Sequence, residues 1–164
     1  MKIIKVFLVE MILPLLTAWF FMTVLVDIVA IPTVFKNISN MQEGAKIGMT
    51  LFGKFNCIEI FLGLSILLGS FLMKEKSKVM ITLALILLAF SIIYTFFMTP
   101  MIANNSIQLH LVLATDSHYE ILQKEHRTFH ELYRTLDTIK LVLLLIFSGL
   151  MIHFNIKRMH KECI

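Results

Sequence analysis

The stretch LFGKFNCIEI, residues 51–60, places polar and charged side chains at the beginning of a long apolar run. Lys54, Asn56 and Glu59 stand there among Phe, Ile and Leu residues. Ionisable groups at membrane depth are costly unless they are paired or face the interior of a helix bundle. We therefore expect this stretch to belong to the functional part of a membrane protein.

The composition supports that expectation. Of the 164 residues 58% are hydrophobic and 16% are charged, and the mean hydropathy is +0.84. Soluble domains have roughly 45–50% apolar and about 25% charged residues. The net charge is +4, and the basic residues lie beside the apolar runs, as they do at a membrane surface. A nucleic-acid-binding protein would need a dense basic stripe on one folded face. We expect the lipid bilayer as a partner, and no nucleic acid.

Four apolar runs predict an all-α bundle of four transmembrane helices in a single domain. Each run is near the ~20 residues that a hydrocarbon core of about 30 Å needs. The predicted spans cover about 6–31, 50–73, 79–99 and 137–156.

Three prolines and two polar stretches mark the expected boundaries. Pro14 should kink the first span, because proline removes a helical hydrogen bond. Pro32 and Pro100 are expected to end the first and third spans. Residues 35–44 then form a polar loop, and residues 102–128 form a long polar connection that becomes helical from His118 onward.

The distribution of Lys and Arg predicts that both termini are cytoplasmic, since short cytoplasmic flanks carry the positive charge. The first loop offers only Lys36 and Lys46 on the other side. Helices two and four should protrude outward over about 42–53 and 117–136. Compact size and the lack of a targeting extension favour a bacterial inner membrane. The residues of the predicted cytoplasmic flanks are Lys2, Lys5, Lys74, Lys76, Lys78, Lys157, Arg158 and Lys161.

Polar side chains gather near the predicted outer boundary, with equal numbers of acids and bases. Such a set can neutralise itself, so ion pairs between helices are favoured over anion binding or a proton relay. The predicted buried polar cluster consists of Asp27, Lys54, Asn56, Glu59, Arg134, Asp137 and Lys140. Glu10 stands apart, where it can reach the aqueous surface or pair with a basic residue.

A weak internal repeat relates the two halves of the chain. LYRTLDTIKL, residues 132–141, aligns without gaps on residues 51–60, and IPTV at 31–34 corresponds to TPMI at 99–102. Two hairpins of the same orientation would be related by an axis along the membrane normal. That axis predicts Glu59 opposite Lys140 and Asn56 opposite Asp137.

Histidines suggest a metal site as an alternative to a solvated outer helix. His126 and His130 are four residues apart and share a helix face, and His118 precedes them. Imidazoles at this spacing can hold Zn or Cu. The solvated helix is favoured because a second histidine pair or a cysteine pair is missing. Haem is favoured still less, and no cofactor is expected.

The chain resembles the transmembrane protein 205-like family. The resemblance rests on the proline-marked first helix, on GMTLF at residues 48–52 and on FHELYRTLD at residues 129–137. The resemblance implies a small four-helix membrane domain without established catalysis. The histidine, serine and asparagine of that family's last-helix signature are replaced here by residues such as Tyr133, Leu136 and Asp137.

No nucleophile elbow, P-loop, dinucleotide-binding glycine pattern or HExxH motif occurs in the sequence, so an enzyme is not expected. Our leading hypothesis is a membrane protein that acts through helix–helix contacts, as an accessory subunit or a homo-oligomer. Gly63 and Gly69 offer small residues for such close contacts. The alternative is a small carrier or channel-like protein that handles a proton, a metal ion or a small anion.

Overall fold

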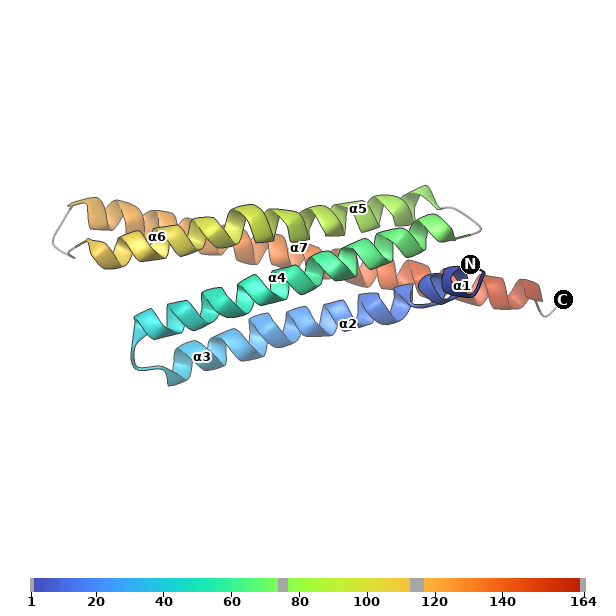
Figure 1. Ribbon diagram of the computed structural model, residues 1–164, viewed down its shortest axis with the longest axis horizontal. Coiled ribbons are helices and arrows are strands. Elements are labelled where there is room, and N and C mark those ends of the chain that lie inside the picture. The colour runs from blue at the N-terminus through green and yellow to red at the C-terminus, as the bar shows by residue number, and fades with distance from the viewer. Residues whose placement is uncertain (1, 74–76, 113–116, 163–164) are drawn as a thin grey trace.

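The protein is a bundle of four long helical rods. The structure, a computed structural model, describes residues 2–73, 77–112 and 117–162. Figure 1 shows the rods side by side along one long axis, and all regular structure in these residues is helical. Each rod contains a helix long and apolar enough to cross a membrane, which indicates an integral membrane protein. These helices are Ile12–Asn37, Gln42–Leu72, Lys78–Leu111 and His118–His160.

Two of the rods are single helices, and two are built from segments. The second rod is α4 (Met41–Leu72) and the fourth is α7 (Ser117–Glu162). The first rod consists of α1 (Lys2–Glu10), α2 (Ile12–Val24), the π-helical turn η1 (Leu25–Ala30) and α3 (Ile31–Asn37). The third consists of α5 (Lys78–Ile93), the π-helical turn η2 (Tyr94–Met98) and α6 (Thr99–Leu111).

The prediction that Pro32 and Pro100 end their helices is wrong. Each proline is the second residue of a segment that continues its rod, to Asn37 and to Leu111. Proline has no N–H, so the carbonyl four residues before it loses its helical partner. A π-helical turn lies directly ahead of each proline and accommodates that loss.

The helical extent also corrects the predicted loops. The first polar loop shrinks to residues 38–40, because α3 runs to Asn37 and α4 begins at Met41. Residues 102–111 are helical, and so is the chain from Ser117. The predicted helix from His118 onward is confirmed. The helix of the first rod is interrupted at Met11. Met11 follows Glu10, whose carbonyl group has no helical partner because Pro14, four residues later, has no N–H.

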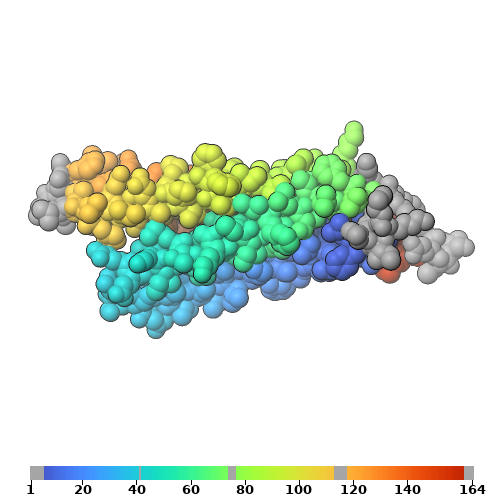
Figure 2. Space-filling view, in the orientation of Figure 1, coloured from blue at the N-terminus to red at the C-terminus, as the bar shows by residue number. Residues whose placement is uncertain are grey.

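The rods are arranged so that α4 and α7 face each other across the bundle. α4 packs against α2 and α5, and α7 packs against the same two helices. Figure 2 shows the surface of α4 filling the space between the first and third rods. The two rods that contain a π-helical turn therefore occupy one diagonal of the bundle, and the two uninterrupted rods occupy the other. This is the arrangement that an axis relating two hairpins produces.

The core is divided along the length of the bundle into an apolar part and a polar part. The apolar part lies toward the end that holds α1 and the last turns of α7 (Figure 1). The outer surfaces of the rods expose many Phe, Leu and Ile side chains, which suits contact with lipid. The buried apolar residues are Ile12, Leu16, Trp19, Leu62, Ile66, Met73, Met80, Ala84, Leu87, Leu144, Phe147 and Met151.

The beginning of the first rod and the end of the fourth lie at the same end of the molecule (Figure 1). At this end Arg158 Nη2 lies 3.6 Å from Glu10 Oε1, an ion pair between half-exposed side chains. Pairing of Glu10 with a basic residue was one of the two roles predicted for it. That this end faces the cytoplasm stays a prediction. Of the residues in the predicted cytoplasmic flanks, Lys74 and Lys76 lie outside the described part of the chain.

Two glycines of α4 allow close helix approach, as predicted. A Cβ at Gly69 would lie 2.8 Å from the carbonyl oxygen of Leu8, and one at Gly63 would lie 3.3 Å from Leu88 Cα. Both contacts are with backbone atoms of a neighbouring rod. The rods can pack at these distances only where the side chain is a hydrogen atom.

We expect Gly69→Ala to destabilise the bundle by about 1–3 kcal/mol, because the added methyl group overpacks the contact with α1. Gly149→Ala is the matched control. Apart from its chain neighbours and the nearby backbone of its own helix, no described atom lies within 4 Å of a Cβ at Gly149. Unfolding of the purified protein in a denaturing detergent measures both changes. Equal stability of the two variants would contradict the close contact.

Candidate functional site

An ion pair between Glu59 and Lys140 crosses the centre of the bundle. Lys140 Nζ lies 2.6 Å from Glu59 Oε1, and both side chains are fully buried, with 0% exposure. The pair joins α4 to α7, the two helices that lie diagonally opposite. The pairing predicted from the internal repeat is therefore confirmed.

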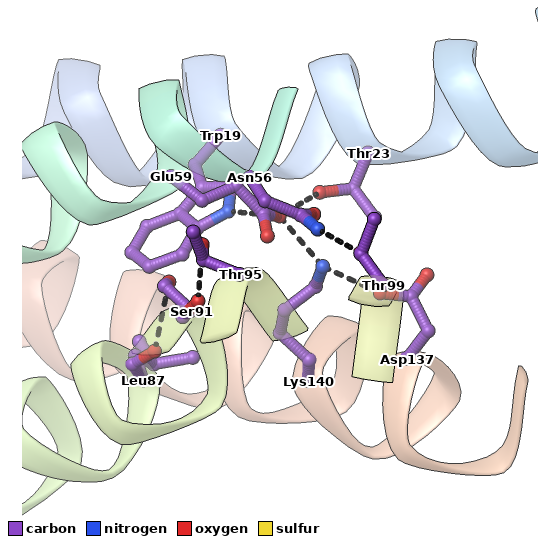
Figure 3. A network of polar contacts seen from close by, with 10 residues as sticks. All are labelled: Trp19, Thr23, Asn56, Glu59, Leu87, Ser91, Thr95, Thr99, Asp137 and Lys140. Atoms are coloured by element: carbon purple, nitrogen blue, oxygen red, sulfur yellow. Dashed lines mark hydrogen bonds and ion pairs between the residues drawn. The ribbon is translucent and has the colours of Figure 1, made fainter. Parts of the chain in front are cut away.

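Three donors converge on one oxygen of Glu59 (Figure 3). Besides Lys140, the indole Nε1–H of Trp19 donates at 2.8 Å and the hydroxyl of Thr23 donates at 3.4 Å, both to Oε1. The other oxygen, Oε2, is buried and has no hydrogen-bond partner among the described residues. One oxygen of Glu59 therefore receives all three of these donors.

Two further carboxyl groups extend the cluster on the other side of Lys140. Lys140 Nζ lies 2.5 Å from Asp137 Oδ1, one turn earlier on α7. Asp27, on the π-helical turn η1, lies close enough to Asp137 and Lys140 to interact with their charges. Two ionised carboxylates this near each other would repel one another.

Asn56 lies beside the ion pair but takes a different partner from the predicted one. Its Nδ2 donates to Thr99 Oγ1 at 2.7 Å. Asn56 is fully buried, and its Oδ1 has no partner among the described residues. Its amide points into the same space as the carboxyl group of Glu59 (Figure 3).

The structure corrects the expected charge balance. Lys54 and Arg134, both predicted to belong to the buried cluster, have exposed side chains. Arg134 directly follows the buried Tyr133, and Lys54 directly precedes the buried Phe55. A step of one residue turns a side chain by about 100° around a helix, which directs both bases away from the centre of the bundle.

The cluster consequently combines three carboxyl groups with one ammonium group. Full ionisation of Asp27, Glu59, Asp137 and Lys140 would leave two negative charges without a partner in an apolar bundle. Uncompensated buried charges are strongly unfavourable, so the cluster must bind protons or another cation to persist. The ring of Tyr94 supports the ammonium group, with its centroid 4.9 Å from Lys140 Nζ.

Several members of the site were missed by reading the sequence. Trp19, Thr23, Tyr94 and Thr99 carry no charge, so a search for ionisable residues passed over them. One signal could have revealed the first two. The buried positions of the first rod keep a helical spacing of three or four residues that ends on Asp27. These positions are Ile12, Leu16, Trp19, Thr23 and Asp27, with Asp27 half-buried.

Two of the three histidines singled out as metal ligands lie in contact. His126 Nε2 lies 3.1 Å from His130 Nε2, and His126 Nδ1 lies 3.0 Å from Oδ1 of the buried Asn105. His118 is exposed at the start of α7. Within the described ranges no group of three or more His, Cys, Asp or Glu side chains is arranged to hold a metal ion. The contacts of the pair are those of hydrogen-bonded imidazoles.

A small cavity lies beside His130, and none of the four charged residues of the cluster lines it. Its volume is about 50 Å³, and it lies between α4, α6 and α7. Thr99, which accepts the hydrogen bond of Asn56, lines this cavity together with His130. The described residues that line it are Met49, Phe52, Thr99, Ile102, His130 and Tyr133.

Comparison of the chain with protein-family models, with curated proteins and with solved structures found no match. The chain provides buried carboxyl groups in excess, a buried ammonium group between them, and hydroxyl and amide groups around them. This set can take up and release protons.

We expect Lys140→Met to destabilise the bundle by about 3–5 kcal/mol, because it leaves the buried carboxyl groups without their ammonium partner. Adding Glu59→Gln to that variant should recover part of the loss, since it removes one unpaired charge. A double-mutant cycle in detergent unfolding measures the coupling between the two residues. Strictly additive losses would show that the pair carries no interaction energy.

Proposed function

We propose that this chain is a non-enzymatic membrane protein that binds and releases protons at the cluster of Asp27, Glu59, Asp137 and Lys140, as a small proton carrier. The observation that carries the proposal is the excess of buried carboxyl groups over ammonium groups. A self-neutralising set of ion pairs would have supported a purely structural role. With Lys54 and Arg134 exposed, the remaining charges do not balance.

A proton is favoured over a metal ion by the position of Lys140. Its ammonium group lies 2.6 Å from Glu59 Oε1 and 2.5 Å from Asp137 Oδ1. It thereby occupies the space between the carboxylates that a bound metal ion would need. An anion is disfavoured because the three carboxyl groups would repel it. A proton needs no separate space, since it binds to a carboxyl oxygen.

A carrier is favoured over an open channel by the apolar part of the core. Leu144, Phe147 and Met151 come after Lys140 on the same face of α7, and all three are buried. They pack with apolar side chains of the other rods, and the buried Ser70 donates to the carbonyl oxygen of Ile66 on its own helix, so the described polar side chains form no continuous path through this half of the bundle. A proton bound at the cluster would need a change of conformation to leave on that side.

The other predicted properties remain part of the proposal. We propose that both termini are cytoplasmic and that the membrane is a bacterial inner membrane, from the Lys and Arg distribution. The resemblance to the transmembrane protein 205-like family is compatible with such a small carrier. The exposed apolar faces do not favour the accessory-subunit or homo-oligomer hypothesis over a monomer, because such faces suit lipid equally well.

Proton flux into liposomes that contain the purified protein tests the proposal. After a pH jump, a pH-sensitive dye inside the vesicles should report exchange that Glu59→Gln slows by about tenfold or more, as expected for loss of an essential proton-transfer group. Glu10→Gln is the matched control, because Glu10 is exposed and pairs with Arg158 away from the cluster. Equal rates in empty vesicles and in vesicles with wild-type protein would refute a carrier.

Proton binding itself can be measured through Trp19, which is the single tryptophan of the chain. Its indole donates directly to Glu59 Oε1, so its fluorescence should change with pH as the charge of the cluster changes. In Glu59→Gln the amide does not titrate, and we expect the emission to lose most of that pH dependence. An unchanged pH profile in this variant would show that Glu59 is not one of the groups whose titration changes the emission.

A further inference from the structure

A second polar group lies where α6 ends and α7 begins, at the end of the bundle opposite the two termini (Figure 1). It consists of Asn105 on α6 and of Glu125, His126 and His130 on α7. The two histidines are four residues apart and therefore share one face of α7. None of the four residues of the proton-binding cluster belongs to this group, so what it does is independent of the proposed function.

Asn105 determines which ring nitrogen of His126 carries hydrogen. Asn105 is 5% exposed, and its Nδ2 donates to the carbonyl oxygen of Leu122 at 3.5 Å and to Glu125 Oε2 at 3.4 Å. Its Oδ1 lies 3.0 Å from His126 Nδ1. An amide oxygen only accepts hydrogen bonds, so Nδ1 is the donor in this contact. Neutral His126 therefore has its lone pair on Nε2, the nitrogen that faces His130.

This arrangement is the one that proteins give to a metal-binding histidine. Such a histidine donates its other ring N–H to a carbonyl oxygen or a carboxylate, which orients the ring and makes the ligating nitrogen more basic. Asn105 Oδ1 accepts that hydrogen bond from His126, and Glu125 accepts from the amide of Asn105. The support is partly buried, although the histidines themselves reach the surface.

The distance between the two free nitrogens suits a single metal ion. His126 Nε2 lies 3.1 Å from His130 Nε2. With metal–nitrogen bonds of about 2.0–2.1 Å, an ion bound to both would have an N–metal–N angle of about 95–100°. This angle lies between those of square-planar and tetrahedral coordination, and imidazole is a preferred ligand of copper, nickel and zinc.

The surroundings of the pair are polar, so an ion can reach it from water. His130 is exposed, and the exposed neighbours on α7 are charged: Lys124, Glu125, Arg127 and Glu131. Among the described residues no third His, Cys, Asp or Glu is arranged to complete the site. The remaining coordination positions would be taken by water. Two protein ligands favour weak and reversible binding, unlike the closed four-ligand sites that stabilise a fold.

We propose that His126 and His130 bind one divalent transition-metal ion through their Nε2 atoms, with Asn105 as a positioning residue. Cu²⁺ should bind more tightly than Zn²⁺, and Mn²⁺ should bind most weakly. In the metal-free pair the hydrogen between the rings belongs to His130 Nε2, because Nε2 of His126 is the acceptor. On metal binding this hydrogen moves to His130 Nδ1 through solvent. Both rings stay neutral, and no other reactant is required.

Calorimetric titration of the purified full chain, carrying no histidine tag, with Cu²⁺, Zn²⁺ or Mn²⁺ tests the site. We expect one ion per chain, with affinities in that order. His130→Gln should weaken Cu²⁺ binding by at least about tenfold, because only one of the two imidazole ligands remains. His153→Gln is the matched control, since His153 is exposed on the same helix far from the pair.

Asn105→Ala tests the positioning role with both ligands present, and it should weaken Cu²⁺ binding by about 10–100-fold. His126→Gln replaces it if that variant does not fold. Electron paramagnetic resonance of the Cu²⁺ form should show two nitrogen ligands in the wild type and one in His130→Gln. Equal affinity in the wild type, His130→Gln and His153→Gln would mean an adventitious ion only and would overturn the proposal. Failure of the wild type to bind any of the three ions would also overturn it.

Discussion

The ion pair between Glu59 and Lys140 is the constraint on which the rest of the site depends. It joins the two helices that lie diagonally opposite, so its geometry fixes the spacing of all four rods at one level. Burying two charges is favourable only if their geometry is good and their remaining hydrogen-bonding capacity is used. Lys140 meets that condition through Asp137 and the ring of Tyr94. Glu59 meets it through one oxygen, which Trp19, Thr23 and Lys140 share.

The π-helical turns place the remaining groups around this pair. η1 carries Asp27, and η2 begins with the buried Tyr94. Both turns precede a proline and occupy equivalent positions in the two halves of the chain. A π-helical turn inserts one extra residue into a helix and rotates the residues after it, and such turns are frequent at functional sites. The prolines therefore shape the site, although they do not contact its charges directly.

Much of the architecture could be predicted from the sequence, because hydropathy and helix length are strong signals in a membrane. The diagonal pairing of Glu59 with Lys140 was predicted from the alignment of two short segments. The prolines were misread as helix ends. In lipid an interrupted helix still has to satisfy its backbone groups internally, so the rods continue past Pro32 and Pro100.

The membership of the site was less predictable, because counting charges ignores the direction of each side chain. Lys54 and Arg134 lie one residue away from buried positions, and that single step places them on the outside. Trp19 and Thr23 were overlooked because their role is to donate hydrogen bonds to a neighbour's carboxylate. Their place on the buried face of the first rod could be predicted from the spacing. Their partner could not, because it lies on another helix.

The order of the residues along the chain has a consequence for biosynthesis. Glu59 and Lys140 are separated by 81 positions, on the second and fourth rods. During synthesis the acid must enter the bilayer well before its ammonium partner exists. Trp19 and Thr23 belong to the rod made first, so their donors are already present when Glu59 arrives. Lys140 arrives last, with Asp137 one turn away on the same helix. Each charged rod thus has a nearby partner before the four rods come together.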